Sequence, residues 1–187
     1  MKFNEHSKLK GAHALLSPSS YHWLRYDEEK LRRSMISAKA AEVGTRLHAF
    51  AAEAISLGMR LPKTRQTVNM FVNDAIKYRM EPELVLFYSP WCFGTTDALG
   101  FDRNFLRIHD MKTGVTKASM DQLLIYGGLF LLEYDISPRS IDGEFRIYQN
   151  DEILGHRYDP EEMEDIVHHI VWANDILEAM EKEQAEV

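Results

Sequence analysis

A strand, a turn and a second strand between residues 94 and 114 constrain the fold of this chain more than any other stretch. The segment 104–112 is rich in apolar side chains, as expected of a buried strand, and Thr113-Gly114 ends it. The segment 94–101 precedes it across the turn dipeptide Asp102-Arg103. Two such segments separated by so short a turn predict an antiparallel pair of strands.

Each strand of this pair carries an aspartate. Asp110 and Lys112 lie two residues apart, and because side chains alternate along a strand, both project from the same face. Antiparallel pairing around the turn brings Asp97 close to Asp110. Carboxylate oxygens suit hard divalent cations, and an ammonium group beside them can stabilise a reacting phosphate. The stretch therefore predicts that Asp97, Asp110 and Lys112 form a site for phosphate chemistry at one sheet margin.

The remaining sequence predicts an α/β fold with a central mixed sheet of about five strands flanked by helices. We expect one domain over residues 1–187, with a core at about 40–158 and with a basic N-terminal helix and an acidic C-terminal helix as additions. Strands are predicted at 83–88, 91–101, 104–112, 140–149 and 152–158, and helices at 38–58, 64–80, 119–134 and from Asp159-Pro160 onward.

Residues around the third predicted helix allow two interpretations. Ser119 is a good helix cap, and Ser119-x-x-Gln122 fits a capping box, in which Gln122 only closes the helix start. Gln122 and Tyr126 also lie one turn apart on one face, where a carboxamide and a phenol could hold a phosphate or a water at the strand end. Trp91 and Phe93 are expected in the core or on a sheet face, with base stacking as the alternative.

Charge is distributed unevenly along the chain. The net charge is −7, yet residues 1–40 hold eight Lys/Arg and four Asp/Glu, whereas residues 151–187 hold two and twelve. A basic N-terminal part is consistent with DNA on that side, although charged runs are equally typical of solvated faces. The candidate phosphate contacts are Arg25, Arg32, Arg33 and Lys117.

Composition excludes several classes of protein. The chain has no run of about 18 apolar residues, so no membrane span is predicted, and the N-terminus has no secretory apolar stretch. The single cysteine, Cys92, cannot form an intramolecular disulfide framework and favours a reducing compartment, so we expect a cytoplasmic protein. One cysteine also cannot supply a four-ligand iron–sulphur site.

The 94–114 stretch resembles the PD-(D/E)XK nuclease superfamily, in its RecB-like and phage exonuclease branch. The acid-x-lysine element is Asp110-Met111-Lys112, and the upstream acid is Asp97. Residues 44–48, Gly-Thr-Arg-Leu-His, are similar to the glycine-to-histidine motif of the first core helix. Residues 122–126 are similar to the Gln-x-x-x-Tyr motif that follows the lysine strand. All four elements occur in the family's order, over roughly residues 40–130.

The resemblance implies a restriction-endonuclease-like core and a metal-dependent deoxyribonuclease, most simply an exonuclease on linear duplex or single-stranded ends. It implies one or two Mg²⁺ or Mn²⁺ ions held by His48, Asp97, Asp110 and the Met111 carbonyl. Lys112, Gln122 and Tyr126 would complete the catalytic set. Many relatives in this branch carry an iron–sulphur cluster, which this chain lacks the cysteines to hold.

Cellular context is implied by the same resemblance and by the size of the chain. Both suit phage or mobile-element replication or recombination in a bacterial or phage-infected cell. A partner from those processes and an oligomeric state are compatible with this setting, and neither is specified by the sequence.

Two rival interpretations remain open. The chain could be a nuclease-like protein that binds DNA or a protein partner without cutting. It could also be a metal-dependent hydrolase of another substrate, or an interaction module whose motif matches are accidental.

Overall fold

The computed structural model describes residues 14–185, and the chain forms two compact units, residues 1–45 and 46–187, each described here by itself. The first unit contains the 3₁₀ helix η2 (Pro18–Arg25) and the first part of α1 (Glu28–Ser56). The rest of α1, from Arg46 onward, belongs to the second unit.

Helix α1 begins earlier than the predicted start at residue 38. Asp27 accepts the backbone N–H of Lys30 at 2.7 Å and so satisfies a free donor of the first turn. Glu28 and Glu29 occupy that first turn, where the helix dipole favours acids. Gly44 consequently lies inside the helix rather than at its start.

The second unit is built on a five-stranded mixed sheet in the order β1-β2-β3-β4-β5. The first three strands form an antiparallel meander, β4 runs parallel to β3 after the α3 crossover, and β5 returns antiparallel to β4. This confirms the predicted α/β class and mixed sheet. The strands are β1 (Glu81–Ser89), β2 (Cys92–Asp102), β3 (Phe105–Met111), β4 (Asp142–Gln149) and β5 (Glu152–Arg157).

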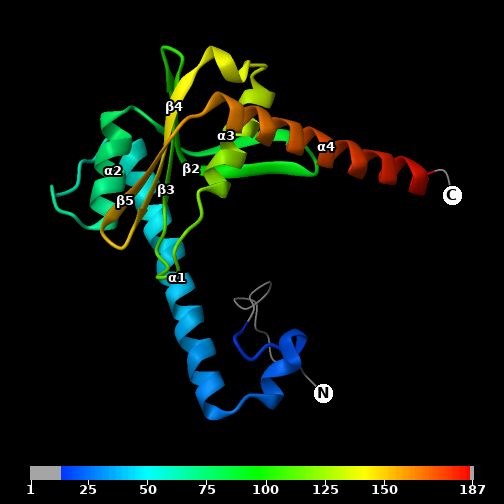
Figure 1. Ribbon diagram of the computed structural model, residues 1–187. Helices are drawn as coiled ribbons and strands as arrows, with labels where there is room; N and C mark the ends of the chain where they lie inside the picture. Colours follow the sequence, from blue (N-terminus) through cyan, green and yellow to red (C-terminus); the bar gives the residue numbers. More distant parts are fainter. Residues whose placement is uncertain (1–13, 186–187) are drawn as a thin grey trace, which may run out of the picture. The chain divides into compact units, whose positions relative to one another are not determined.

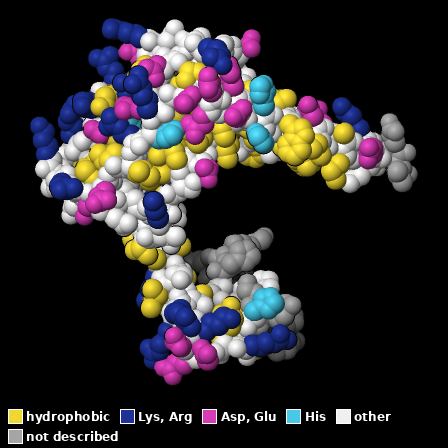
Figure 2. Space-filling model, in the orientation of Figure 1, with side chains coloured by type: hydrophobic (Ala, Val, Ile, Leu, Met, Phe, Trp, Pro, Cys, Tyr) yellow, Lys and Arg dark blue, Asp and Glu magenta, His cyan; other side chains and the backbone are white. Residues whose placement is uncertain are grey.

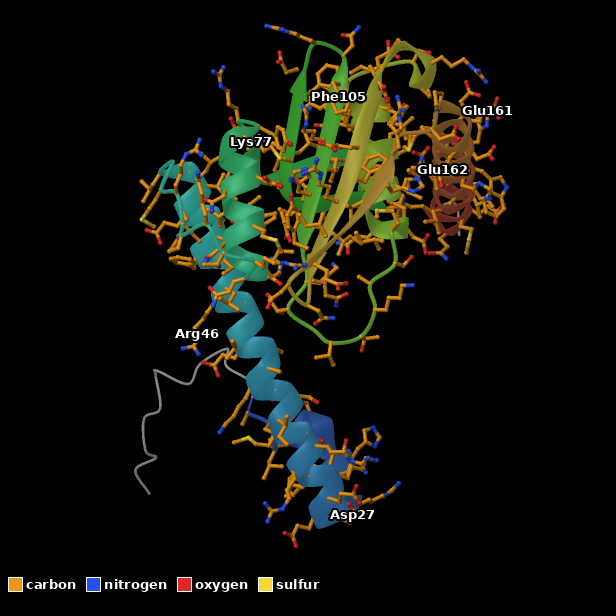
Figure 3. The ribbon with its side chains drawn as sticks, turned by 60° about the vertical axis from the view of Figure 1, so that its left-hand side comes forward. Asp27, Arg46, Lys77, Phe105, Glu161 and Glu162 are labelled. Atoms are coloured by element: carbon orange, nitrogen blue, oxygen red, sulfur yellow. The ribbon has the colours of Figure 1, made fainter. Side chains whose placement is uncertain are left out.

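Helices cover both faces of this sheet. Figure 3 shows α2, which ends at Lys77, on one side of the strands, and the start of α4, marked by Glu161 and Glu162, on the other. Helix α3 lies with α4 on that second side (Figure 1). No helix within residues 14–185 is both long and apolar enough to cross a bilayer. The helices are α2 (Thr67–Lys77), α3 (Asp121–Glu133) and α4 (Pro160–Ala185), with a short η3 (Pro138–Ser140).

Strand β3 is buried on both faces and contributes to two hydrophobic clusters. Leu106 and Ile108 pack in the cluster that includes α3, whereas Met111 packs in the cluster that includes α2 and the second part of α1. This double burial explains why β3 is largely apolar, with polar side chains retained mainly near its end.

The register of β2 against β3 sets up the site. Ala98 pairs with His109 and Leu99 with Ile108, so continuing by one residue sets Asp97 opposite Asp110. The predicted antiparallel approach of the two aspartates is therefore confirmed.

Three local predictions were wrong in detail. Helix α2 is shorter than 64–80, because Arg79 adopts a positive φ of 55° that ends the helical path. Of the two locations predicted for Trp91 and Phe93, the core is wrong, since these residues are 48% and 62% exposed. Phe93 lies on a face of β2, as the other predicted location has it, and Trp91 lies in the hairpin turn. Helix α3 starts at Asp121, whose backbone N–H is accepted by Ser119 Oγ at 3.3 Å. Oε1 of Gln122 accepts from Lys112 instead of closing the helix start, so the capping-box interpretation of Gln122 is also wrong.

Two glycines of the sheet provide a matched test of its packing. A Cβ on Gly143 would lie 2.5 Å from the backbone oxygen of Leu106, which cannot move cheaply, whereas a Cβ on Gly155 meets nothing within 4 Å. We expect Gly143→Ala to destabilise the fold by roughly 1–3 kcal/mol, as overpacking does. Gly155→Ala should be neutral or slightly stabilising. Urea denaturation of both variants measures the difference, and equal midpoints would contradict the β3–β4 packing described here.

Candidate active site

Asp110 is the last but one residue of β3, and its carboxylate is nearly buried, with a side chain 4% exposed. The Nζ atom of Lys112 donates to Oδ1 at 3.1 Å and lies 2.9 Å from Oδ2. The second contact lacks hydrogen-bond geometry, so Oδ2 is buried without a hydrogen bond. Burial, and then the nearby charge of Asp97, raise the pKa of Asp110 despite the lysine. The prediction that Asp110 and Lys112 share a face is confirmed.

Asp97 is held by donors from two other segments. Its Oδ2 accepts the backbone N–H of Met111 at 2.8 Å, and its Oδ1 lies 3.2 Å from Nδ1 of His48 on α1. The hydrogen bond with Asp97 is the main cause that raises the pKa of His48. In a strand, the N–H and C=O of one residue point to the same neighbour, so the Met111 carbonyl faces the same gap between β2 and β3.

A chain of hydrogen bonds links Lys112 to α3. Lys112 Nζ donates to Oε1 of Gln122 at 2.6 Å, and Nε2 of Gln122 donates to the Tyr126 hydroxyl at 3.4 Å. That hydroxyl donates to the backbone oxygen of Thr95 at 2.7 Å. Gln122 and Tyr126 therefore face the strand end, as their helical spacing predicted, and they fix the position of the lysine.

Gly94 provides the space that Tyr126 needs. A Cβ at Gly94 would lie 2.9 Å from Cε1 of the tyrosine ring, closer than side chains tolerate. The glycine therefore lets α3 approach β2 closely enough for the bond between Tyr126 and Thr95. No sequence pattern pointed to Gly94 or Thr95, which lie three and two residues before Asp97.

A glutamine that the sequence analysis missed holds the loop between Lys112 and α3. Nε2 of Gln149 donates to the backbone oxygens of Gly114 at 2.6 Å and Thr116 at 2.8 Å, and its Oε1 accepts the Ala118 N–H at 3.2 Å. All three bonds come from the last residue of β4. The signal available in the sequence was a polar residue, Gln149, at the end of an alternating strand.

The predicted DNA-contacting cations belong to different parts of the chain. Arg25 lies on η2, and Arg32 and Arg33 lie on α1 within the first unit. Arg32 and Arg33 pair with Glu28 and Glu29 one turn earlier at 2.6 and 3.4 Å. Lys117 is exposed in the loop after Lys112. Their contacts with DNA stay predictions.

The donor chemistry suits a divalent cation, but a complete ligand set is not assembled. Within residues 14–185, no three His, Cys, Asp or Glu side chains are arranged to hold a metal ion. Lys112 lies against Asp110, and His48 lies against Asp97. Asp97 and Asp110 lie close enough for the charge of one to raise the pKa of the other, and a bound cation would compensate that charge in addition to Lys112. The chemical types of the candidate ligands suit a divalent cation; these ligands are His48, Asp97, Asp110 and the Met111 carbonyl.

Comparison of the chain with protein-family models, with curated proteins and with solved structures finds no match. The family resemblance therefore stays a prediction that rests on the motifs and on their arrangement in space.

The raised pKa of Asp110 predicts how stability depends on pH. The folded protein holds a proton at Asp110 more tightly than the unfolded chain, so stability falls as pH rises from the ordinary carboxyl value of 3.8 through the raised value. Asp110→Asn removes this loss of folding stability, because asparagine carries no carboxyl group that ionises as pH rises. In chelator near pH 7, we expect its melting temperature to exceed that of the parent by about 2–4 °C, the shift that about 1 kcal/mol produces in a chain of this size.

His48 supplies an internal control for that experiment. Protonated His48 stabilises the fold below pH 6.5, and this contribution declines as pH rises through the raised pKa of His48. The same decline should persist in Asp110→Asn, because the hydrogen bond with Asp97 is the main cause of the raised pKa. A melting temperature of Asp110→Asn below that of the parent throughout the neutral range would contradict the environment described for Asp110.

The role of Gln149 predicts the protease sensitivity of the loop. Gln149→Ala removes three hydrogen bonds to loop backbone, so trypsin should cut after Lys117 at least about tenfold faster, with the fold retained. Glu152→Ala, an exposed change on neighbouring β5, is the control. Limited proteolysis with mass mapping measures the rates, and equal rates for both variants would show that Gln149 does not hold the loop.

Proposed function

We propose that this chain is a metal-dependent deoxyribonuclease that hydrolyses phosphodiester bonds, most simply at DNA ends. The observation that carries the proposal is the convergence of side chains from separate segments at one sheet margin. His48 comes from α1, Asp97 from β2, Asp110 and Lys112 from the end of β3 and Gln122 and Tyr126 from α3.

The carboxylates would bind the cation, since Asp97 and Asp110 present hard oxygen donors and the Met111 carbonyl faces the same gap. A bound divalent cation supplies Lewis-acid chemistry, which activates water and neutralises charge on the scissile phosphate. His48 would orient Asp97 through their contact or take part in the ligand set.

Lys112 would act on the reacting phosphate. Its ammonium group is held between Asp110 and Gln122 at 3.1 and 2.6 Å, so it is fixed in place before substrate binds. A preorganised cation stabilises the negative charge that builds on the phosphoryl oxygens in the transition state, and it can orient the attacking water. Gln122 and Tyr126 would position this group, and the second amide N–H of Gln122 would be the donor to a phosphate oxygen.

Substitution at the strand end tests the proposal. Asp110→Asn and Lys112→Ala should each reduce cleavage of labelled linear duplex or single-stranded DNA, with Mg²⁺ or Mn²⁺, by at least about a hundredfold. Arg103→Ala is the matched control, because this exposed arginine lies at the opposite end of the same strand pair. Undiminished cleavage by the Asp110 and Lys112 variants would overturn the proposal. Comparing linear with circular DNA separates cleavage at ends from internal cleavage.

A nuclease-like protein that binds without cutting is the second candidate, and one observation favours it. Lys112 forms an ion pair with Asp110, in place of a metal ion, and no metal ligand set is assembled among the described residues. Calorimetric titration of the parent protein with Mg²⁺ and Mn²⁺ separates the two candidates. Binding that Asp97→Asn abolishes supports the nuclease, whereas the absence of binding supports the second candidate.

A further inference from the structure

Helix α4 carries a regular apolar seam that continues beyond the helix it packs on. Along α4, apolar residues recur at alternating spacings of three and four, the pattern of a coiled-coil interface. The seam consists of Met163, Ile166, Ile170, Ala173, Leu177 and Met180.

The first half of the seam has a partner within the chain. A Cβ on Gly127 of α3 would lie 2.9 Å from Met163, and a Cβ on Gly128 would lie 2.8 Å from both Ile166 and Ile170. The glycine pair thus allows α3 and α4 to approach closely. The two helices therefore pack against each other over this half of the seam.

The second half of the seam is open. Ala173, Leu177 and Met180 are exposed, the last two at 39% and 49%. Figure 2 shows hydrophobic side chains gathered along α4 where it extends towards its C-terminal end. The same apolar stripe therefore passes from a packed segment into an unpacked one.

A groove of about 480 Å³ runs beside this half, between α4 and the β1–β2 hairpin. Trp91 and Cys92 line it from the hairpin, and Ala173 and Leu177 line it from α4. Asn174 also lines it, with a side chain that is buried and an Oδ1 that accepts no hydrogen bond. Buried acceptors are rarely left in this state, so the groove lacks a donor.

The charge along the outer half of α4 selects the occupant. Glu181 and Glu183 flank the open seam at the positions that contact a partner helix, and the hairpin segment 81–101 contains no Lys or Arg. Lys182 is the sole Lys or Arg after residue 157 and lies 4.0 Å from Glu178 on its own helix. A second copy of α4 would bring only further carboxylates to these flanks.

We propose that the outer half of α4 and the adjoining groove form a docking site for a basic amphipathic helix of a partner protein. The partner continues the seam with apolar residues at three–four spacing, places Lys or Arg against Glu181 and Glu183, and offers a donor to Asn174. This site is separate from the candidate active site and does not depend on the proposed function.

Two synthetic helical peptides of about four heptads test the proposal, both with Leu and Ile in the seam, one with Lys at the flanking positions and the other with Glu. We expect the Lys peptide to bind the full chain one to one and at least about tenfold more tightly than the Glu peptide, with weaker binding at high salt. Fluorescence anisotropy of labelled peptide and light scattering after size exclusion measure affinity and stoichiometry.

Variants of the chain locate the site. The double variant Leu177→Ser/Met180→Ser should abolish binding, and both positions are exposed, so the fold, checked by circular dichroism, should persist. Ile153→Ser, at an exposed apolar position on β5, should bind like the parent. Equal affinity for the two peptides, or no binding of either, would overturn the proposal. Self-association of the parent chain that Leu177→Ser/Met180→Ser abolishes would instead assign the seam to a second copy.

Discussion

The pairing of β2 with β3 forces the carboxylates of Asp97 and Asp110 onto one margin of the sheet, and the rest of the site is arranged around that like-charge pair. Each acid has its own donors, with His48 and the Met111 N–H at Asp97 and Lys112 at Asp110. These donors do not fully offset the burial of Asp110 and the nearby charge of Asp97, since the pKa of Asp110 remains raised. A proton or a cation at this margin would therefore stabilise the fold, and a site with that property favours binding of positive charge.

The opposite face of β3 provides a rigid support directly behind Asp110. The Tyr148 hydroxyl donates its proton to Asp74 at 2.8 Å, so Nδ1 of His109, 3.2 Å away, must donate to that hydroxyl. Burial lowers the pKa of His109 to about 3, which keeps the ring neutral. Arg146 binds the same Asp74 at 3.0 Å. These bonds join α2, β3 and β4, so the strand that carries Asp110 is fixed by polar contacts as well as by apolar packing.

The parts of this arrangement that could be predicted from sequence depend on local periodicity. Alternation along a strand placed Lys112 beside Asp110, a short turn set Asp97 opposite, and helical spacing aligned Gln122 with Tyr126. The double burial of β3 and the five-stranded α/β core also follow from patterns of apolar residues.

Other parts depend on contacts between segments that no local pattern encodes. The amide of Gln149 binds a loop more than thirty positions earlier in the chain, and Gly94 serves a tyrosine on another element. The start of α1 was missed for a different reason. A single acid, Asp27, caps this helix, and the apolar residues of its first turns are exposed, so they do not form the core-facing stripe that predicts a helix.

The candidate active site and the groove beside α4 each contain a buried polar atom without a hydrogen bond. Such atoms are rare in folded proteins because each forfeits its hydration. Among the buried side-chain atoms of residues 14–185, they are Oδ2 of Asp110, Nε2 of His109 and Oδ1 of Asn174. The first lies at the candidate active site, the second lies directly behind it on β3, and the third lines the groove beside α4. At the sheet margin, the ammonium group of Lys112 lies 2.9 Å from Oδ2 of Asp110 and already supplies positive charge there. At Asn174, no described side chain or backbone group donates to Oδ1, so a partner helix that carries a donor would satisfy this acceptor.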